Sequence, residues 1–110
     1  LQSYFTAINE HDYSAYVSLL IPSIAHNESA SAFSAGYSST TDSAASLTAI
    51  STTESGVAAT VTFTSNQQPS QSPDNSACDN WTITLYLAQA GSGYLIGTPP
   101  TSYSATHSPC

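Results

Sequence analysis

The stretch from Cys78 to Gly97 constrains the fold of this chain more than any other part of the sequence. Its apolar side chains recur at every second position, the period of a strand that buries one face. They are Trp81, Ile83, Leu85 and Leu87. Ala90-Gly91-Ser92-Gly93 then supplies the glycines that a tight turn requires, and Tyr94 to Ile96 returns as a second strand. The stretch predicts a β-hairpin.

The first part of the chain has helical spacing instead. Leu1, Tyr4, Phe5 and Ile8 fall at i, i+3, i+4 and i+7, which places them on one face of a helix. Asp12 is suited to cap a second helix, which we expect to end before Pro22. Residues 23–27 predict a loop. Residues 28–35 predict a short third helix that Gly36 ends in a left-handed conformation.

Two further strands are predicted before the hairpin, over residues 45–53 and 57–65. Leu47 and Ile50 would lie on opposite faces of the first, so either both faces are covered or a bulge shifts the pattern. Residues 65–76 predict a flexible loop, and residues 101–110 an irregular tail. Residues 1–110 therefore predict one α+β domain, with N-terminal helices on a curved antiparallel sheet of about four strands.

The complete absence of lysine and arginine, with a formal net charge of -7, excludes several functions. A phosphate clamp and a Schiff-base amine are chemically unavailable, and nucleic acid is not an expected partner. No apolar run reaches the roughly 18 residues of a membrane span, so we expect no membrane insertion by this segment. We see no signal peptide and expect an export signal or anchor upstream.

The chain has two cysteines, Cys78 and Cys110. We predict that they form a disulfide, which would close a loop of about 30 residues and stabilise the fold by roughly 3.5 kcal/mol. Two free thiols or a bond between molecules are the alternatives. A disulfide and a surface rich in hydroxyl groups indicate an extracytoplasmic location, either secreted or at the cell surface.

The segment from Tyr4 to Tyr16, YFTAINEHDYSAY, resembles the first helical hairpin of the NTF2-like (SnoaL-like) superfamily. Phe33 to Tyr37 resembles its short third helix, and strands at 45–53, 57–65, 81–88 and 94–97 follow the order of its curved sheet. More narrowly, the chain is similar to extracytoplasmic domains of actinobacterial membrane or secreted proteins. The resemblance implies a cone-shaped fold. It departs from the family in having no arginine and in the tail that ends at Cys110.

Few residues indicate chemistry by themselves. His11, His26 and His107 lie far apart in the sequence, which favours exposed or locally bonded histidines over a metal site. Glu10 and Asp12 flank His11, yet the helix cap already explains Asp12. Two acids and two amides, Asp74, Asn75, Asp79 and Asn80, could offer oxygen atoms to calcium, but such residues are also common in loops. We predict no catalytic residues, metal or cofactor.

Four aromatic residues are expected to converge between helices and sheet, either as a packed core or as the lining of a pocket: Tyr4, Tyr16, Phe63 and Trp81. The leading hypothesis is a non-catalytic binding, sensor or dimerisation module of a larger protein. Its partner would be a protein, a small ligand or another copy of the chain. The alternatives are a small-molecule-binding or enzymatic domain that uses the cone, and a structural subunit of a surface layer or filament.

Overall fold

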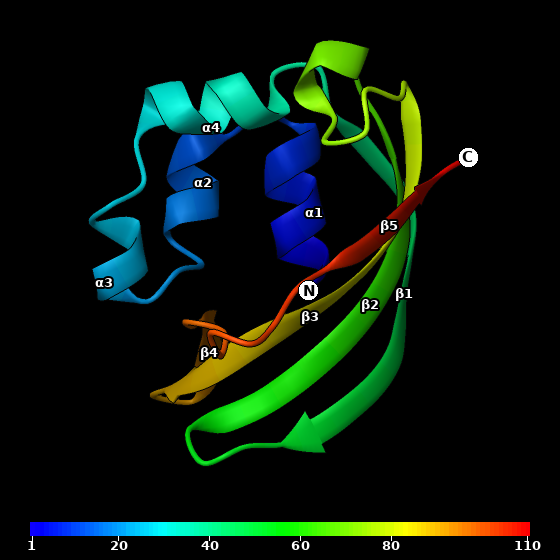
Figure 1. Cartoon of the computed structure of the whole chain (residues 1–110). Coiled ribbons are helices and arrows are strands. Elements are labelled where there is room, and N and C mark those ends of the chain that lie inside the picture. Colours follow the sequence, from blue (N-terminus) through cyan, green and yellow to red (C-terminus); the bar gives the residue numbers. More distant parts are fainter.

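The computed structural model describes residues 1–110 as an α+β domain, which confirms the predicted fold class. The elements are α1 Gln2–Asn9, α2 Tyr13–Val17, α3 Pro22–Ala25, α4 Ala30–Tyr37, β1 Thr41–Thr52, β2 Gly56–Asn66, the 3-10 turn η1 Pro69–Gln71, β3 Cys78–Ala90, β4 Gly93–Ile96 and β5 Thr106–Pro109. In Figure 1 the helices lie on the concave side of a curved sheet, and the lower ends of β1, β2 and β3 project beyond them.

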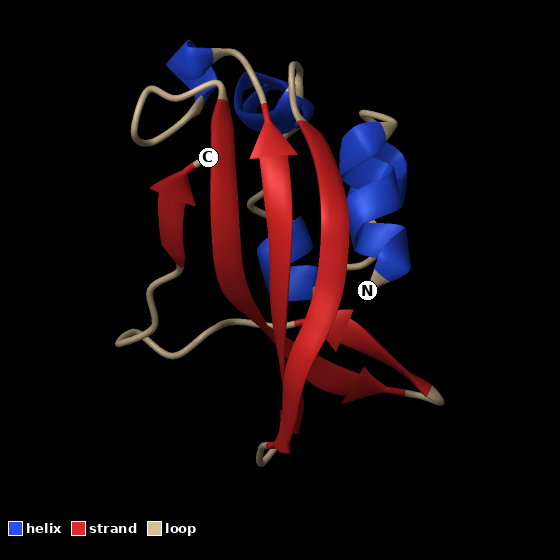
Figure 2. Ribbon diagram, turned by 90° about the vertical axis from the view of Figure 1, so that its right-hand side faces the viewer, coloured by secondary structure: helices blue, strands red, loops and turns tan.

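The sheet is antiparallel and open, with strand order β1-β2-β3-β4 and with β5 also paired to β3 (Figure 2). β4 and β5 share one edge of β3, at its opposite ends. The sheet thus has five strands instead of the predicted four, and the tail expected to be irregular contains the fifth. Thr106–Pro109 has no apolar alternation, so only its backbone pairing and the nearby disulfide reveal it as a strand.

The core lies between α1 and the middle of the sheet, and Phe33 of α4 extends it by packing on Tyr13 and Tyr16 of α2. Ile8 and Phe5 of α1 are buried with Phe33 of α4 and Val61 of β2. The rings of Phe5 and Phe63 lie 4.9 Å apart between centroids, so α1 packs directly on the sheet. Phe5 and Ile8 of the expected apolar stripe are thus buried, whereas Leu1 lies just before α1 and is 43% exposed.

Local signals at the helix ends are only partly as expected. Asp12 caps α2 as predicted, because its carboxylate accepts the amide of Ala15 at 3.1 Å. Pro22 begins α3 instead of ending a helix, since proline fits the first helical position, where no N–H donor is needed. The loop predicted over residues 23–27 was therefore wrong over its first half.

The end of α4 also differs from expectation. Ser29 caps its start by accepting the amide of Ala32 at 3.1 Å, and the helix runs through Gly36 to Tyr37. Among the glycines only Gly91, in the hairpin turn, has a positive φ, of 61°. Gly36 was thus wrongly expected to end the helix.

Strand β1 resolves the phase problem posed by Leu47 and Ile50. Its pairing with β2 shifts register between Ser43 and Ser46 and again between Leu47 and Ala49, so a bulge is the correct alternative. The other alternative, in which both faces of the strand are covered, is wrong, because Leu47 is 48% and Ile50 61% exposed.

The disulfide between Cys78 and Cys110 is present, with Cα atoms 5.4 Å apart, which confirms the predicted pairing. It joins the first residue of β3 to the residue after β5. The amide of Cys110 also donates to the carbonyl of Cys78 at 3.1 Å.

None of the helices has the length and apolar character of a membrane-spanning segment.

The loop between β2 and β3 is held in place by side-chain hydrogen bonds. The side-chain amide of Gln71 donates to the carbonyl of Ala35 and to Ser38 Oγ, both at 2.8 Å, and its oxygen accepts the amide of Ser39 at 3.1 Å. These bonds fix the loop against the end of α4. They also position the next residues of the loop, from Ser72 to Ser76, near the start of β3.

Candidate functional site

A pocket of about 170 Å³ lies between the helices and the concave face of the sheet. Tyr4, Tyr37, Phe63 and Trp81 contribute its aromatic walls. The rings of Phe63 and Trp81, which pair across β2 and β3, stack at 6.4 Å with an interplanar angle of 9°. The volume lies below the range of about 300–1,000 Å³ typical of drug-sized ligands, so it suits only a small molecule.

Three of the four aromatic residues singled out in the sequence line this pocket, namely Tyr4, Phe63 and Trp81. Tyr16 lies behind the wall. The centroid of its ring lies 5.9 Å from that of Tyr4 and 4.9 Å from that of Phe33. Tyr16 thus packs α2 against α1 and α4. The four residues therefore form both a pocket lining and part of a packed core.

Asp42 is a carboxylate in the pocket wall near Tyr4 of α1 and Tyr37 of α4, and no pattern in the sequence indicated it. It is 8% exposed, and its Oδ1 has no hydrogen-bond donor. Burial raises the pKa of its carboxyl to about 6, although the hydroxyl of Ser65, its partner on β2, acts in the opposite direction. The group can thus exchange a proton near neutral pH.

The side chain of Asn9 sets the position of Asp42. Its Nδ2 donates to the carbonyl of Asp42 at 2.9 Å, and its Oδ1 accepts the Asp42 amide at 2.6 Å. This pair of bonds ties the last residue of α1 to the beginning of β1. Asn9 is therefore a positioning residue for the pocket, and its place at the end of an apolar helix did not reveal that role.

The hydroxyls of Tyr4 and Tyr37 lie near Asp42, and that of Tyr16 lies next to Tyr37. Burial raises the pKa of Tyr4, Tyr16 and Tyr37, and for Tyr4 and Tyr16 the neighbouring Tyr37 adds to the effect. The hydroxyls therefore stay protonated at physiological pH and can donate hydrogen bonds. This end of the pocket offers a carboxylate acceptor together with neutral donors.

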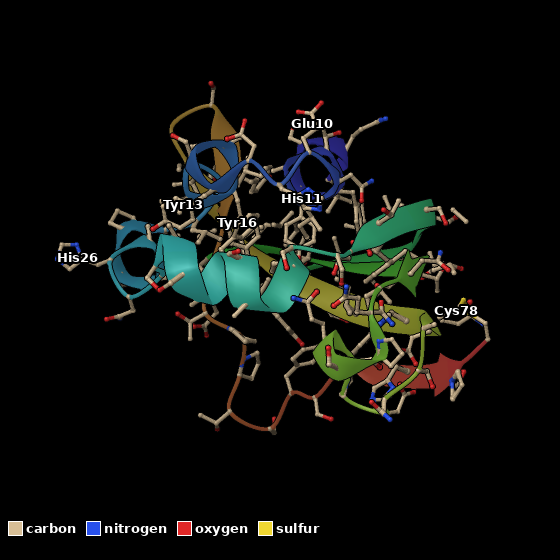
Figure 3. All side chains as sticks on the ribbon, turned by 90° about the horizontal axis from the view of Figure 1, so that it is seen from above. Glu10, His11, Tyr13, Tyr16, His26 and Cys78 are labelled. Atoms are coloured by element: carbon tan, nitrogen blue, oxygen red, sulfur yellow. A yellow bond between two sulfur atoms is a disulfide. The ribbon has the colours of Figure 1, made fainter.

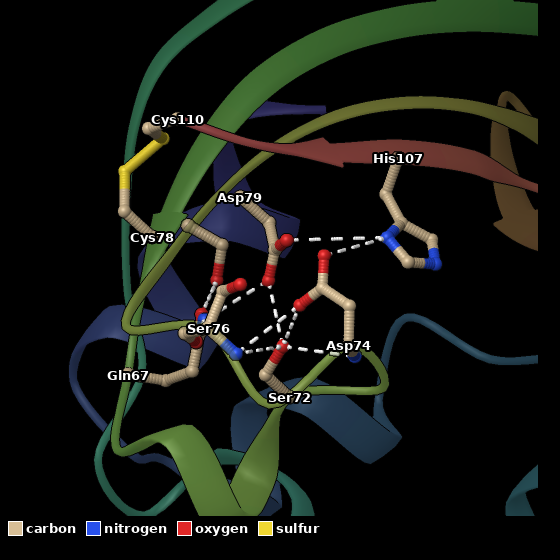
Figure 4. Close-up of polar contacts among 9 residues, drawn as sticks. Gln67, Ser72, Asp74, Ser76, Cys78, Asp79, His107 and Cys110 are labelled. Atoms are coloured by element: carbon tan, nitrogen blue, oxygen red, sulfur yellow. Dashed lines mark hydrogen bonds and ion pairs between the residues drawn. A yellow bond between two sulfur atoms is a disulfide. The ribbon is translucent and has the colours of Figure 1, made fainter.

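A second carboxylate, Asp79 of β3, lines the opposite part of the pocket and is 0% exposed. Asp74 of the loop and His107 of β5 meet it there (Figure 4). His107 Nδ1 lies 3.3 Å from Asp74 Oδ2 and 3.9 Å from Asp79 Oδ1. The fold thus brings together three side chains from segments that are distant in sequence, including one histidine that sequence reasoning set apart.

The pKa values of the two carboxyls shift in opposite directions. Burial, followed by the nearby Asp74, raises the pKa of Asp79, while interaction with Asp79 and then the hydrogen bond from Ser72 hold the pKa of Asp74 well below its ordinary value. Two carboxylates this close resist simultaneous ionisation. The arrangement concentrates negative charge, with one histidine as the only side chain that could compensate it.

The remaining candidates lie elsewhere. His26 points outward at one end of the molecule, and His11 lies near α1 with its Nε2 3.2 Å from the carbonyl of Thr40 (Figure 3). Of the four residues considered for calcium, only Asp74 and Asp79 converge. Asn75 is exposed, and Asn80 projects from the other face of β3, where it accepts the hydroxyl of Thr64 at 3.0 Å.

Comparisons with protein-family models, with curated proteins and with solved structures give no match for this chain. The resemblance to NTF2-like proteins thus rests on the sequence pattern and on the order of the elements.

Proposed function

We propose that this chain is a non-catalytic, extracytoplasmic binding domain of the NTF2-like type, which holds a small ligand between its helices and its curved sheet. The disulfide between Cys78 and Cys110 supports the location, because such bonds persist in oxidising compartments. The order of helices followed by a curved antiparallel sheet supports the family.

One observation carries the binding role: Asp42 Oδ1 is a buried carboxylate oxygen without a donor, and it belongs to the wall of an aromatic-lined pocket. A buried polar atom of this kind is costly unless something pairs with it. A ligand that brings a hydrogen-bond donor or a positive charge would supply the missing partner. Trp81 and Phe63 would contact its apolar part and attract a cation through their ring faces.

Binding is favoured over turnover because the pocket offers an acceptor but no strong nucleophile. Both cysteines are in the disulfide, and the chain contains no lysine. The tyrosines on its walls have raised pKa values and remain neutral. Acid–base catalysis by Asp42 alone is the enzymatic alternative, and turnover of a bound probe would reveal it.

The test is a titration of the chain with n-butylammonium at pH 7.5, followed by NMR of the backbone amides and the Trp81 indole. We expect saturable shifts at Asp42, Thr40 and Trp81, and weaker binding at pH 4.5, where Asp42 is protonated. 1-Butanol, which has the same chain length and no charge, should bind more weakly. Asp42→Asn should abolish the difference between the two probes, whereas Glu54→Gln in an exposed turn should preserve it.

Equal shifts with amine and alcohol, or no change in Asp42→Asn, would contradict the role of the carboxylate. The absence of any saturable shift would show that the pocket does not accept such ligands.

The dimerisation role has one observation of its own in strand β1. This strand is a 12-residue sheet edge on which Leu47 and Ile50 are exposed. It contains neither lysine nor proline, the residues that commonly prevent edge pairing. Beyond its bulges, residues 49–52 keep a regular register and could pair with the same residues of a second copy.

Light scattering after size exclusion should then show a concentration-dependent dimer that Ile50→Lys abolishes. A monomer at every concentration would refute the dimerisation role.

A further inference from the structure

Asp74, Asp79 and His107 aim three potential metal-ligand atoms at one point. These atoms are Asp74 Oδ2, Asp79 Oδ1 and His107 Nδ1, and all lie within 4.8 Å of one another. They come from the loop after η1, the start of β3 and the strand β5. Figure 4 shows the two carboxylates and the imidazole facing each other beside the disulfide.

The two carboxylate oxygens that face the histidine have no hydrogen-bond donor. Each carboxylate is oriented through its other oxygen. Asp79 Oδ2 accepts Gln67 Nε2 at 3.1 Å and lies 2.8 Å from Ser72 Oγ, and Asp74 Oδ1 accepts the amide of Ser76 at 3.2 Å. Such outer bonds are typical of carboxylates that are held in position to bind a cation.

Hydrogen bonding inside the protein does not satisfy this group. The distances of 3.3 and 3.9 Å from His107 Nδ1 exceed those of normal N–H···O bonds, about 2.7–3.2 Å. One imidazole N–H can also serve only one of the two oxygens. Asp79 is 0% exposed, so water cannot reach it freely as a substitute donor. The chain has no lysine or arginine that could approach instead.

A tetrahedral metal ion fits this spacing. Ligand atoms about 2.0–2.2 Å from zinc lie about 3.4 Å from one another at the tetrahedral angle. His107 Nδ1 lies 3.3 Å from Asp74 Oδ2 and 3.9 Å from Asp79 Oδ1, and all three atoms lie within 4.8 Å of one another, so the partly exposed His107 and Asp74 side chains would move inward to reach this spacing. The side chains of His107 and Asp74 are 28% and 22% exposed, which leaves an open side for entry and for a water ligand.

We propose that Asp74, Asp79 and His107 form a binding site for a divalent transition-metal ion of the zinc type. The imidazole nitrogen selects against calcium and magnesium, which prefer oxygen ligands alone. The ion neutralises the two neighbouring carboxylates. It also links β5 to the loop and to β3, next to the disulfide that joins the same two strands.

The site is tested with tag-free protein that has been treated with EDTA and dialysed. Isothermal titration with Zn²⁺ should give one site per chain, and thermal unfolding should shift to higher temperature when the metal is present. His107→Ala should weaken Zn²⁺ binding at least about 10-fold and remove the thermal shift. This variant should fold, because the imidazole is partly exposed and both the disulfide and the backbone pairing of β5 remain. His26→Ala, at an exposed histidine far from the site, is the matched control and should bind as the parent does.

A second variant, Asp74→Asn, removes one ligand charge from a partly exposed position and should also weaken Zn²⁺ binding. An excess of Ca²⁺ should not displace Zn²⁺. No saturable Zn²⁺ binding, unchanged binding in His107→Ala, or equal losses in His107→Ala and His26→Ala would each overturn the proposal. Displacement by Ca²⁺ would overturn the assignment to a transition metal.

Discussion

Asp42 makes the stability of the fold depend on pH in an unusual direction. Its carboxyl has a pKa of about 6 in the folded chain and 3.8 in an ordinary environment, chiefly because it is buried. Between these two values the folded chain holds a proton that the unfolded chain has lost. The group therefore stabilises the fold most below pH 4, and this contribution disappears as the pH rises to about 6.

We predict that the stability difference between the parent and Asp42→Asn changes by about 1–2 kcal/mol between pH 4 and pH 7. The full pKa difference corresponds to about 3 kcal/mol, and solvent at the pocket reduces it. Urea unfolding of both proteins at several pH values measures this difference. The other carboxyls are the same in both proteins, so their contributions to the pH dependence cancel. A difference that does not vary with pH would contradict the assignment.

Asn9 should contribute strongly to stability although it is polar and lies at a helix end. Asn9→Ala removes both bonds to the backbone of Asp42 and leaves the Asp42 amide and carbonyl without those partners. We expect a loss of about 2 kcal/mol in the free energy of unfolding. Asn27→Ala, which removes one exposed bond to the carbonyl of Ser23, should cost less than about 0.5 kcal/mol. Similar losses in the two variants would refute the special role of Asn9.

Among single residues, the sequence indicated the aromatic side chains of the pocket but not its charged side chains. Asp42 follows a threonine in a polar stretch that carries no periodic signal. His107 could have been placed from the disulfide. If Cys78 and Cys110 end two antiparallel strands, counting inward puts His107 opposite Trp81, on the same face as Asp79. The third member of the cluster, Asp74, depends on the path of a loop, which local pattern does not determine.

Among the elements, β5 depends most on a single covalent bond. It has four exposed residues and pairs only with β3. Replacing both cysteines, Cys78→Ser with Cys110→Ser, should lower the free energy of unfolding by about 3–4 kcal/mol. Hydrogen exchange should accelerate at the β5 amides well beyond the change in the centre of β2 and β3. Equal acceleration everywhere would mean that β5 stays docked without the bond.

The elements that could be predicted are those whose apolar side chains repeat. β2 alternates from Val57 to Phe63 and β3 from Trp81 to Leu87, and α1 carries Tyr4, Phe5 and Ile8 on one face. α3 and β5 were missed for different reasons. Pro22 is compatible both with the end of a helix and with its first position, and only the neighbouring strand β4, bonded through Ile21 to Ile96, distinguishes the two. β5 has almost no apolar residues, so tertiary pairing alone makes it a strand.

The whole molecule should become more stable as salt is added. Its formal net charge is -7, and its only ion pairs involve His107. Salt therefore mainly screens repulsion between carboxylates. With a chelator present, we expect the free energy of unfolding at pH 7 to rise by about 1 kcal/mol between 0.05 and 0.5 M NaCl. The effect should shrink at pH 3.5, where most carboxylates are protonated, and a fall in stability with salt would contradict this account.

The two edges of the sheet are very different. Along β3, β5 covers Asp79–Thr82 and β4 covers Leu87–Ala90, while between them the hydroxyl of Tyr103 accepts the amide of Thr84 at 2.7 Å. β4 is bonded to Leu19 and Ile21 on its outer side, and β5 is short and ends in proline, which has no N–H.

Only β1 remains as a long open edge, so the sheet can pair with one further long strand and no more. Two copies could pair through β1 about a twofold axis, and the pair would then have no long edge left for a third. Association of this kind terminates at two chains and cannot propagate into a fibre.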